Sequence, residues 1–223
     1  MLAALVPAGP HENAVSFFGA TRAEARKPLS GDGLVPWPLL QVTHAVTIEA
    51  PPEKVWPWLT RIGQGRAGFY SDSWVWDRAV DWYYRLLSRE SGQTPVGYTY
   101  KDDESVLAGA LRQGDVIADG PPGTACYIVQ EVEPNRTLVL FTTTHLPYML
   151  PKRLRGQVRG MLSDAFVLVP VDGRTRLIRR MRLDCQPWAF RLLALPVVFL
   201  WGELITARQF LRGLKRRAEG RRT

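Results

Sequence analysis

The fold of this chain is decided by LSDAFVLVPV (Leu162–Val171), DG (Asp172-Gly173) and TRLIRRMRLD (Thr175–Asp184). An Asp-Gly pair between two strand-forming runs is a strong β-hairpin signal, because a tight hairpin turn needs residues that tolerate positive φ. Shorter strand patterns precede this hairpin at residues 115–118, 125–132 and 137–143. We therefore expect successive antiparallel hairpins that form a curved sheet with one covered face.

A further strand lies upstream and leads directly into a helix. Residues 42–48 alternate in character, so His44 and Val46 lie on the same face of the strand. The Pro51-Pro52 pair ends the strand and starts a helix, since proline is tolerated in a first helical turn. Apolar residues at helical spacing then continue to Ile62. A second helix is expected over Trp74–Leu87, followed by a mostly irregular segment to residue 111.

The chain closes with a long helix, expected from Trp188 to about Arg217. Its apolar residues occupy most sides, which is typical of a helix that is buried on most sides. The longest apolar run, Leu192–Gly202, contains Pro196 and is shorter than the roughly 20 residues that a membrane-spanning helix needs. A sheet curling around this helix would bury it, so we predict an α+β fold in which a curved antiparallel sheet wraps around the long C-terminal helix.

Composition favours one domain with an extension at its N-terminus. The 223 residues are 46% hydrophobic, which is enough for a substantial core. We divide the chain into a loosely ordered extension (1–35), a helix-grip domain (36–219) and a basic tail (220–223). The separated cysteines Cys126 and Cys185 indicate buried thiols and a reducing cytoplasm.

The net charge of +8 is concentrated in three stretches of the second half of the chain. One of them, residues 174–182, holds five arginines. Such charge either forms a solvated surface or attracts nucleic acid or anionic lipid. No nucleic-acid-binding motif accompanies it, so we expect no specific nucleic-acid partner.

Five segments resemble the SRPBCC superfamily, which includes START domains, Bet v 1-like allergens and polyketide cyclases. They are TIEAPPEKVW (Thr47–Trp56), IGQGRAGFYS (Ile62–Ser71), GDV (Gly114–Val116), GRTRLI (Gly173–Ile178) and LRGLKRRAE (Leu211–Glu219). The resemblance is to a bacterial branch and covers about residues 31–219. It implies a helix-grip fold with a cavity between the sheet and the final helix, and it implies no single activity. The chain departs from the branch between Ser73 and Gly114.

Four side chains are candidates for chemistry or ligand recognition. His44 is either a general base that lines the pocket or a hydrogen-bonded core histidine. Arg66 either binds the polar end of a ligand or forms a salt bridge with Asp115 or Asp72. Tyr70 either donates to a ligand oxygen or is a packed aromatic residue. Arg179 alternates with apolar neighbours, so it marks either a ligand contact or a buried ion pair.

The expected pocket wall combines these candidates with apolar side chains. The predicted ligand-binding residues are Val46, Arg66, Phe69, Tyr70, Leu177, Arg179, Met181 and Phe199. The three histidines lack metal-ligand spacing, so we expect no metal, and no cofactor motif occurs.

Two functions remain open. The first is binding or transport of a lipid-, isoprenoid- or polyketide-like molecule, and the second is a cofactor-independent polyketide cyclase or aromatase. We also expect a cytoplasmic protein that makes weak contact with anionic membranes through the final helix and its basic end, Lys215–Arg217 with Arg221 and Arg222. The sequence leaves the oligomeric state open.

Overall fold

The computed structural model describes residues 14–16, 18–70, 74–90, 111–148, 150–191 and 206–220 of the chain. The strands are β1 (Ala14–Ser16), β2 (Leu40–Ile48), β3 (Val116–Ala118), β4 (Cys126–Glu133), β5 (Thr137–Thr142), β6 (Arg159–Val171) and β7 (Arg174–Gln186). The helices are α1 (Arg22–Arg26), α2 (Pro52–Thr60), α3 (Trp74–Glu90), α4 (His145–Tyr148), α5 (Lys152–Arg155) and α7 (Arg208–Ala218), with 3-10 turns η1 (Asp32–Leu34) and η2 (Trp188–Phe190).

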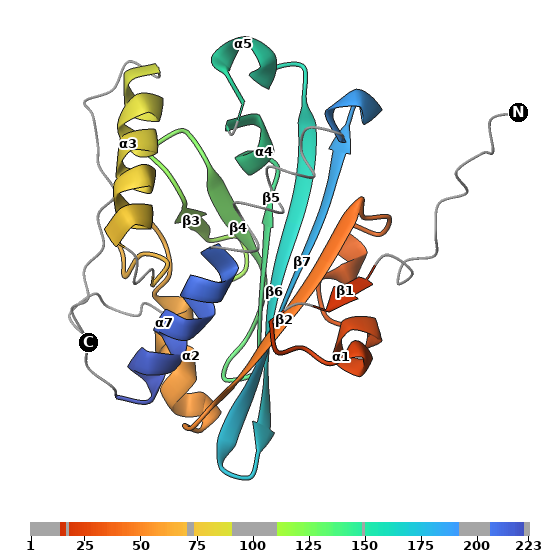
Figure 1. The fold of residues 1–223 in the computed structure, drawn as a ribbon, viewed down its shortest axis with the longest axis vertical. Coiled ribbons are helices and arrows are strands. Elements are labelled where there is room, and N and C mark those ends of the chain that lie inside the picture. Colours follow the sequence, from red (N-terminus) through yellow and green to blue (C-terminus); the bar gives the residue numbers. More distant parts are fainter. Residues whose placement is uncertain are drawn as a thin grey trace, which may run out of the picture.

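All the described strands join one sheet in the order β1-β2-β7-β6-β5-β4-β3. β1 is parallel to β2, and the other neighbouring pairs are antiparallel (Figure 1). The predicted hairpin is confirmed and is longer than expected, because the pairing of β6 with β7 extends to Arg159 opposite Gln186. Asp172 and Gly173 both have positive φ, as the two-residue turn requires.

Helices α2 and α7 lie side by side against one face of the sheet, which we call the helix face (Figure 1). Phe210, Leu211 and Leu214 of α7 are buried in one apolar cluster with Ile48 and Leu177 of the sheet. This arrangement confirms the predicted α+β helix-grip fold. Of the expected final helix Trp188–Arg217, α7 is present as an α-helix, the first three residues form the 3-10 turn η2, and residues 192–205 lie outside the described residues.

One glycine sets how closely α7 approaches the loop after α2. A Cβ atom at Gly213 would lie 2.0 Å from the carbonyl oxygen of Tyr70. No side chain fits at that distance, so glycine is required where α7 crosses this loop. The close approach lets the Tyr70 ring stack on Phe210, with 6.0 Å between the ring centroids.

The opposite side of the sheet, which we call the N-terminal face, is covered by α1 and η1. Within residues 18–35, which we expected to be part of a loosely ordered extension, Ala25 and Val35 are buried. The segment has little apolar periodicity because it docks mainly through polar groups. Its carbonyl oxygens and carboxylates bind arginines of β7, which a search for apolar stripes does not detect.

Three arginines of β7 hold this N-terminal cover. Arg176 donates to both carboxylate oxygens of Glu24, at 2.8 and 2.9 Å. Arg180 is 1% exposed and donates to the Asp32 carboxylate at 2.8 Å and to backbone oxygens of residues 24, 25 and 27. Arg182 is 2% exposed and donates to the backbone oxygen of Asp32. The alternative of a solvated surface is therefore wrong for Arg180 and Arg182.

Burial and pairing perturb the ionisation of this network. Burial lowers the pKa of Arg180 and of Arg182 below the ordinary value, and the charge of Asp32 partly offsets that effect. The hydrogen bond from Arg176 lowers the pKa of Glu24 from 4.5 to about 2. Glu24 also caps α1, where its carboxylate accepts from the Thr21 N–H at 2.7 Å.

We predict that Asp32→Ala strongly destabilises the fold, because it leaves Arg180 and Arg182 buried without their shared carboxylate. Breaking a buried ion pair in this way costs about 3–5 kcal/mol. Urea unfolding followed by circular dichroism measures the change. The control is Glu133→Ala, which removes an exposed pair with Arg136 and is expected to cost less than about 1 kcal/mol. Equal stability of the two variants would contradict the role of Asp32.

We predict that stability falls as the pH drops from about 4.5 towards 2, in part through Glu24. A carboxylate whose pKa is lowered by folding stabilises the native state fully above its unfolded pKa, and this contribution is lost as the carboxylate is protonated. The stability difference between the wild type and Glu24→Gln should therefore shrink across that interval. Urea unfolding at a series of pH values measures it, and a difference independent of pH would contradict the assignment.

Candidate functional site

The predicted site residues on β2 and β7 lie next to one another on the helix face. Val46 pairs with Leu177, His44 with Arg179, and Val42 with Met181. These pairs are alternate rungs of one antiparallel ladder, so their side chains share a face. The structure therefore brings together the five predicted residues His44, Val46, Leu177, Arg179 and Met181.

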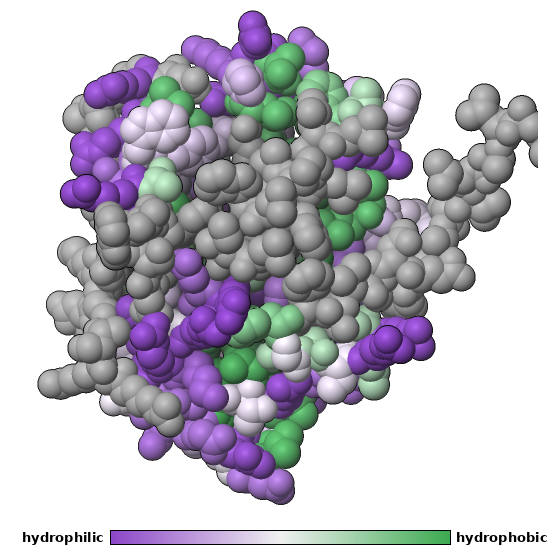
Figure 2. Space-filling model, in the orientation of Figure 1, coloured by the Kyte–Doolittle hydropathy of each residue, from purple (hydrophilic) through white to green (hydrophobic). Residues whose placement is uncertain are grey.

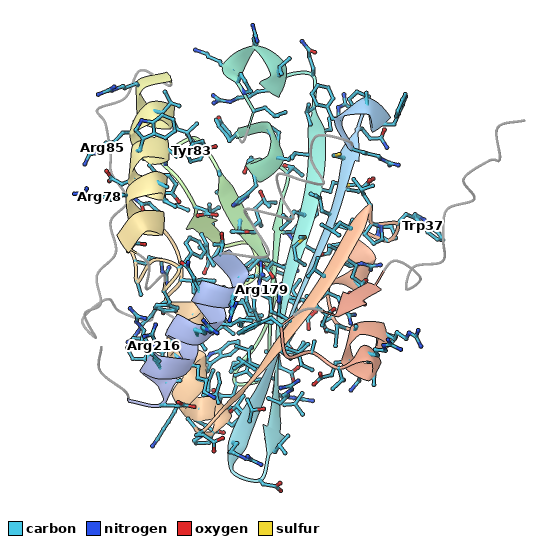
Figure 3. All side chains as sticks on the ribbon, viewed as in Figure 1. Trp37, Arg78, Tyr83, Arg85, Arg179 and Arg216 are labelled. Atoms are coloured by element: carbon cyan, nitrogen blue, oxygen red, sulfur yellow. The ribbon has the colours of Figure 1, made fainter. Side chains whose placement is uncertain are left out.

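Arg179 forms a buried ion pair with Asp164 on the neighbouring strand β6. Its Nε and Nη2 atoms donate to Oδ2 of Asp164 at 3.0 and 2.8 Å. The side chains are only 11% and 6% exposed, respectively. Figure 3 places Arg179 near the middle of the molecule, close to α7 in this view. Of the two alternatives for Arg179, the ion pair is present, and contact with a ligand stays a prediction.

The Arg179–Asp164 pair lies between two apolar clusters of the helix face. The lower cluster contains Leu177 and Phe166 together with α2 and α7. The upper cluster contains Leu40 and Val42 of β2, Met181, Leu183 and Cys185 of β7, Leu146 of α4, and Val158, which precedes β6. A polar group at the boundary of two apolar surfaces is a common way to fix the orientation of an apolar ligand.

Aromatic contacts connect this ion pair to α7. The Arg179 guanidinium carbon lies 6.0 Å from the centroid of the Phe166 ring. Phe166 contacts Phe210 of α7 at 5.6 Å, and Phe210 stacks on Tyr70. The ring contacts make the position of α7 depend on side chains that adjoin the ion pair.

His44 is fully buried, with 0% of its surface exposed, and lies directly across the ladder from Arg179. An imidazole and a guanidinium–carboxylate pair therefore share one small region of the helix face. The structure thus places the general-base candidate of the sequence analysis, the His44 imidazole, beside this ion pair.

Tyr70 has a structural role. Its hydroxyl donates to the carbonyl oxygen of Trp58, and its ring packs edge-on against Trp58. The guanidinium carbon of Arg217, on α7, lies 4.8 Å from the centroid of the Tyr70 ring. With 2% of its surface exposed, Tyr70 acts as the packed aromatic residue of the two sequence alternatives.

Arg66 and Phe69 lie in the loop between α2 and α3, away from the Arg179 rung. Nη2 of Arg66 donates to the carbonyl oxygen of Thr60 at 3.0 Å, at the C-terminal end of α2. Among the described residues, no salt bridge joins Arg66 to Asp115. The Asp115 carboxylate instead accepts from the backbone N–H of Arg112. Phe69 is half-buried against the lower cluster. Asp72 and Phe199 lie outside the described residues.

A second polar cluster, which was not expected from the sequence, joins α3, α4 and β5 to Asp119 in the turn after β3. His145 of α4 binds the carboxylate of Asp119 through Nε2 at 2.7 Å and the hydroxyl of Thr142 through Nδ1 at 2.8 Å. The hydroxyl of Tyr84 on α3 donates to the other Asp119 oxygen at 2.9 Å. Both ring nitrogens of His145 have partners, so this cluster ties α3 and α4 to the sheet.

The partner of Arg179 was detectable in the sequence. Counting outward from the turn at Asp172-Gly173 places residue 181 opposite residue 164, so Asp164 lies diagonally next to Arg179 on the same face. An acidic residue at an inward position of an apolar strand is the signal. No comparable periodic signal links Asp119 with His145, which are 26 residues apart.

Neither a metal site nor a membrane span occurs in the described part of the chain. No group of three or more His, Cys, Asp or Glu side chains there is placed to hold a metal ion. Among the same residues, no helix is both long enough and apolar enough to cross a membrane.

We predict that Arg179 and Asp164 are strongly coupled in stability. Arg179→Met alone leaves a buried carboxylate and should cost about 3–5 kcal/mol. Arg179→Met combined with Asp164→Leu should recover most of that loss, because apolar side chains replace both charges. A double-mutant cycle in urea measures the coupling. Additive effects of the two substitutions would show that the pair is not an energetic unit.

Comparison with known proteins gives structural likenesses alone. No family model matches the chain, and no curated protein matches it. The chain is similar to the Aha1 dimer from Colwellia psychrerythraea, with 19% identity and a TM-score of 0.34 over 74% of this chain and 98% of that one. A protein from Arthrobacter aurescens is 12% identical, with a TM-score of 0.43 over 82% of this chain and 87% of that one.

A third similar structure is CalU16 from Micromonospora echinospora, which is 12% identical with a TM-score of 0.32 over 81% of this chain and 84% of that one. At these identities and TM-scores the likenesses assign neither a family nor a function to the chain.

Proposed function

We propose that this chain is a helix-grip protein of the SRPBCC type that binds an apolar small molecule with one polar end. The observation that carries the proposal is the buried Arg179–Asp164 pair, with His44 beside it, at the boundary between two apolar clusters. The ligand would lie on the helix face of the sheet, with its polar end at this boundary.

The energetics of the ion pair support a functional role. Two charges lose their hydration on burial, and apolar residues of similar size are often as stabilising or more so. Stability alone therefore gives little reason for an arginine and an aspartate at the centre of an otherwise apolar face. Ionisable groups held inside a fold in this way are enriched at functional sites.

The chemistry of the lining defines the class of ligand. The planar guanidinium of Arg179, fixed by two hydrogen bonds to Asp164, suits a carbonyl, hydroxyl or carboxylate oxygen. Val46, Leu177 and Met181 offer apolar contact on either side of it. A lipid-, isoprenoid- or polyketide-like molecule combines these two properties. Phe199 would complete the wall from the segment that follows η2.

We predict that Arg179→Met with Asp164→Leu removes recognition of the polar end while the fold persists. A fluorescent polyene fatty acid and an apolar dye without a polar end serve as probes. The double variant should bind the fatty acid about tenfold more weakly, the equivalent of one lost charge-assisted hydrogen bond, and bind the apolar dye unchanged.

The control variant is Arg174→Met, which alters an arginine of the same strand whose pair with Glu49 is exposed. It should bind both probes as the wild type does. Equal affinity of the double variant and the wild type for the fatty acid would overturn the role of Arg179, and no binding of either probe to the wild type would overturn the proposed function. Native mass spectrometry of protein purified from its own host then identifies the natural ligand.

A cyclase- or aromatase-type enzyme that uses the same cavity is the second candidate. The position of His44 opposite Arg179 supports it, because a base and a cation between two apolar surfaces suit enolisation of a polyketone. His44→Asn separates the two candidates. An enzyme loses conversion of a poly-β-ketone thioester to an aromatic product while keeping its affinity, whereas a binding protein shows no conversion in either form.

Contact of the final helix with anionic membranes also stays a prediction, and two contacts weaken it. The Lys215 ammonium donates to the carbonyl oxygen of Thr47 at 2.7 Å. Arg217 covers the ring of Tyr70 and donates to the carbonyl oxygen of Gly213. These two basic side chains of α7 therefore serve contacts within the protein. The apolar stretch from residue 192 and both terminal arginines lie outside the described residues.

A further inference from the structure

An exposed tryptophan and three exposed basic residues meet at the end of the molecule formed by α5, the start of β6 and η2. Trp188 of η2 is 70% exposed, and Met161 of β6 is 38% exposed. Lys152 and Arg153 of α5 and Arg159 of β6 are exposed as well. We call these five residues the α5–η2 surface.

Strand pairing and the short link from α5 to β6 place these residues at the same end of the sheet. Arg159 pairs with Gln186, two residues before Trp188, and Met161 pairs with Asp184. Arg159 and Met161 alternate on one face of β6, and α5 enters that strand after a three-residue link. Figure 1 places α5 and the end of β7 at the same end of the molecule, and Figure 2 shows hydrophilic and apolar residues side by side around α5.

The charge of this end is one-sided. The sequence contains no Asp or Glu between Glu133 and Asp164, a stretch that includes all of α4 and α5. The carboxylate of Asp184 accepts from Arg191 at 3.0 Å, so a further cation balances the acidic residue nearest to Met161 on the ladder. The surface therefore carries net positive charge around an exposed indole.

We propose that the α5–η2 surface docks onto an anionic lipid membrane. Tryptophan favours the headgroup level of a bilayer, where its ring is apolar and its N–H remains hydrated. Each lysine or arginine close to an anionic surface adds further attraction. Binding to single-stranded nucleic acid relies on a charged groove with successive stacked aromatics. Here one exposed indole and one exposed methionine share an end of the molecule with three exposed cations, which fits a membrane better.

The surface adjoins the apolar interior. Phe190 of η2 and Leu150, which precedes α5, pack against the upper apolar cluster of the helix face. Docking at this end would bring the bilayer next to that cluster. The membrane contact itself rests on the exposed residues and their charge, and it holds whether or not the interior binds the ligand proposed above.

The test is co-sedimentation of the full chain with phosphatidylcholine vesicles, with and without phosphatidylglycerol, at low ionic strength. The wild type should bind the anionic vesicles and release them at physiological salt, where charges are screened over about 8 Å. Trp188→Ala should lower the partition coefficient about tenfold. Lys152→Gln with Arg153→Gln should lower it about twenty-five-fold, fivefold for each charge.

Two control variants match these changes elsewhere on the molecule. Trp82→Ala removes a tryptophan of α3 that is 67% exposed, and Arg216→Gln removes a cation of α7 on the opposite half of the view in Figure 3. Both should bind as the wild type does. A loss with Arg216→Gln equal to that of the α5 variant would move the contact to the final helix and overturn the proposal.

Two further outcomes also overturn it. One is an absence of wild-type binding to anionic vesicles at low salt. The other is binding of a single-stranded oligonucleotide that the same variants abolish, without any binding to lipid, which would make the surface a nucleic-acid site. Every substituted side chain on this surface is exposed, so we expect each variant to keep the fold of the wild type. Urea unfolding of each variant checks this expectation.

Discussion

The fold depends on neutralising the arginines that β7 carries on both of its faces. β7 lies between β2 and β6, so its side chains have a sheet strand on each side and a covering layer above and below. Arg179 points to the helix face, while Arg180 and Arg182 point to the N-terminal face, and all three are buried. A buried cation is tolerated only with matched hydrogen-bond acceptors. The rest of the architecture supplies them on both sides.

On the N-terminal face, the acceptors come from a segment with little regular structure. η1 contributes the Asp32 carboxylate, and α1 contributes Glu24 and several backbone carbonyls. Such contacts cannot be exchanged for water without exposing the whole face, so residues 18–35 act as a structural layer of the domain. They supply the hydrogen-bond acceptors that allow the arginine-rich strand β7 to lie at the centre of the sheet.

On the helix face, the same strand contributes Arg179 to the region where we propose the ligand site. Asp164 neutralises Arg179 within the sheet. The helices above the pair therefore need not supply a further carboxylate. The apolar clusters on either side leave a polar boundary between them, and His44 adds an imidazole ring to it. Alternation along one strand thus separates a scaffold of ion pairs from a candidate site only one residue away.

The sequence by itself indicated α2, α3, the strands from β2 onward and the faces of those strands, since these follow from local backbone geometry, whereas β1, α1, η1, α4 and α5 were not expected. Asp172-Gly173 fixed the register of β6 with β7, the Pro51-Pro52 pair marked the start of α2, and alternation placed His44 and Arg179 on one face. Only the tertiary structure decided which partner each charge found. The burial of Arg180 beneath residues 24–32, the joining of Asp119 to His145 and the turn of Arg66 towards Thr60 link segments without a shared period. Sequence periodicity indicates the face of the sheet on which a side chain lies. The group that contacts this side chain depends on where the connecting segments place the other elements.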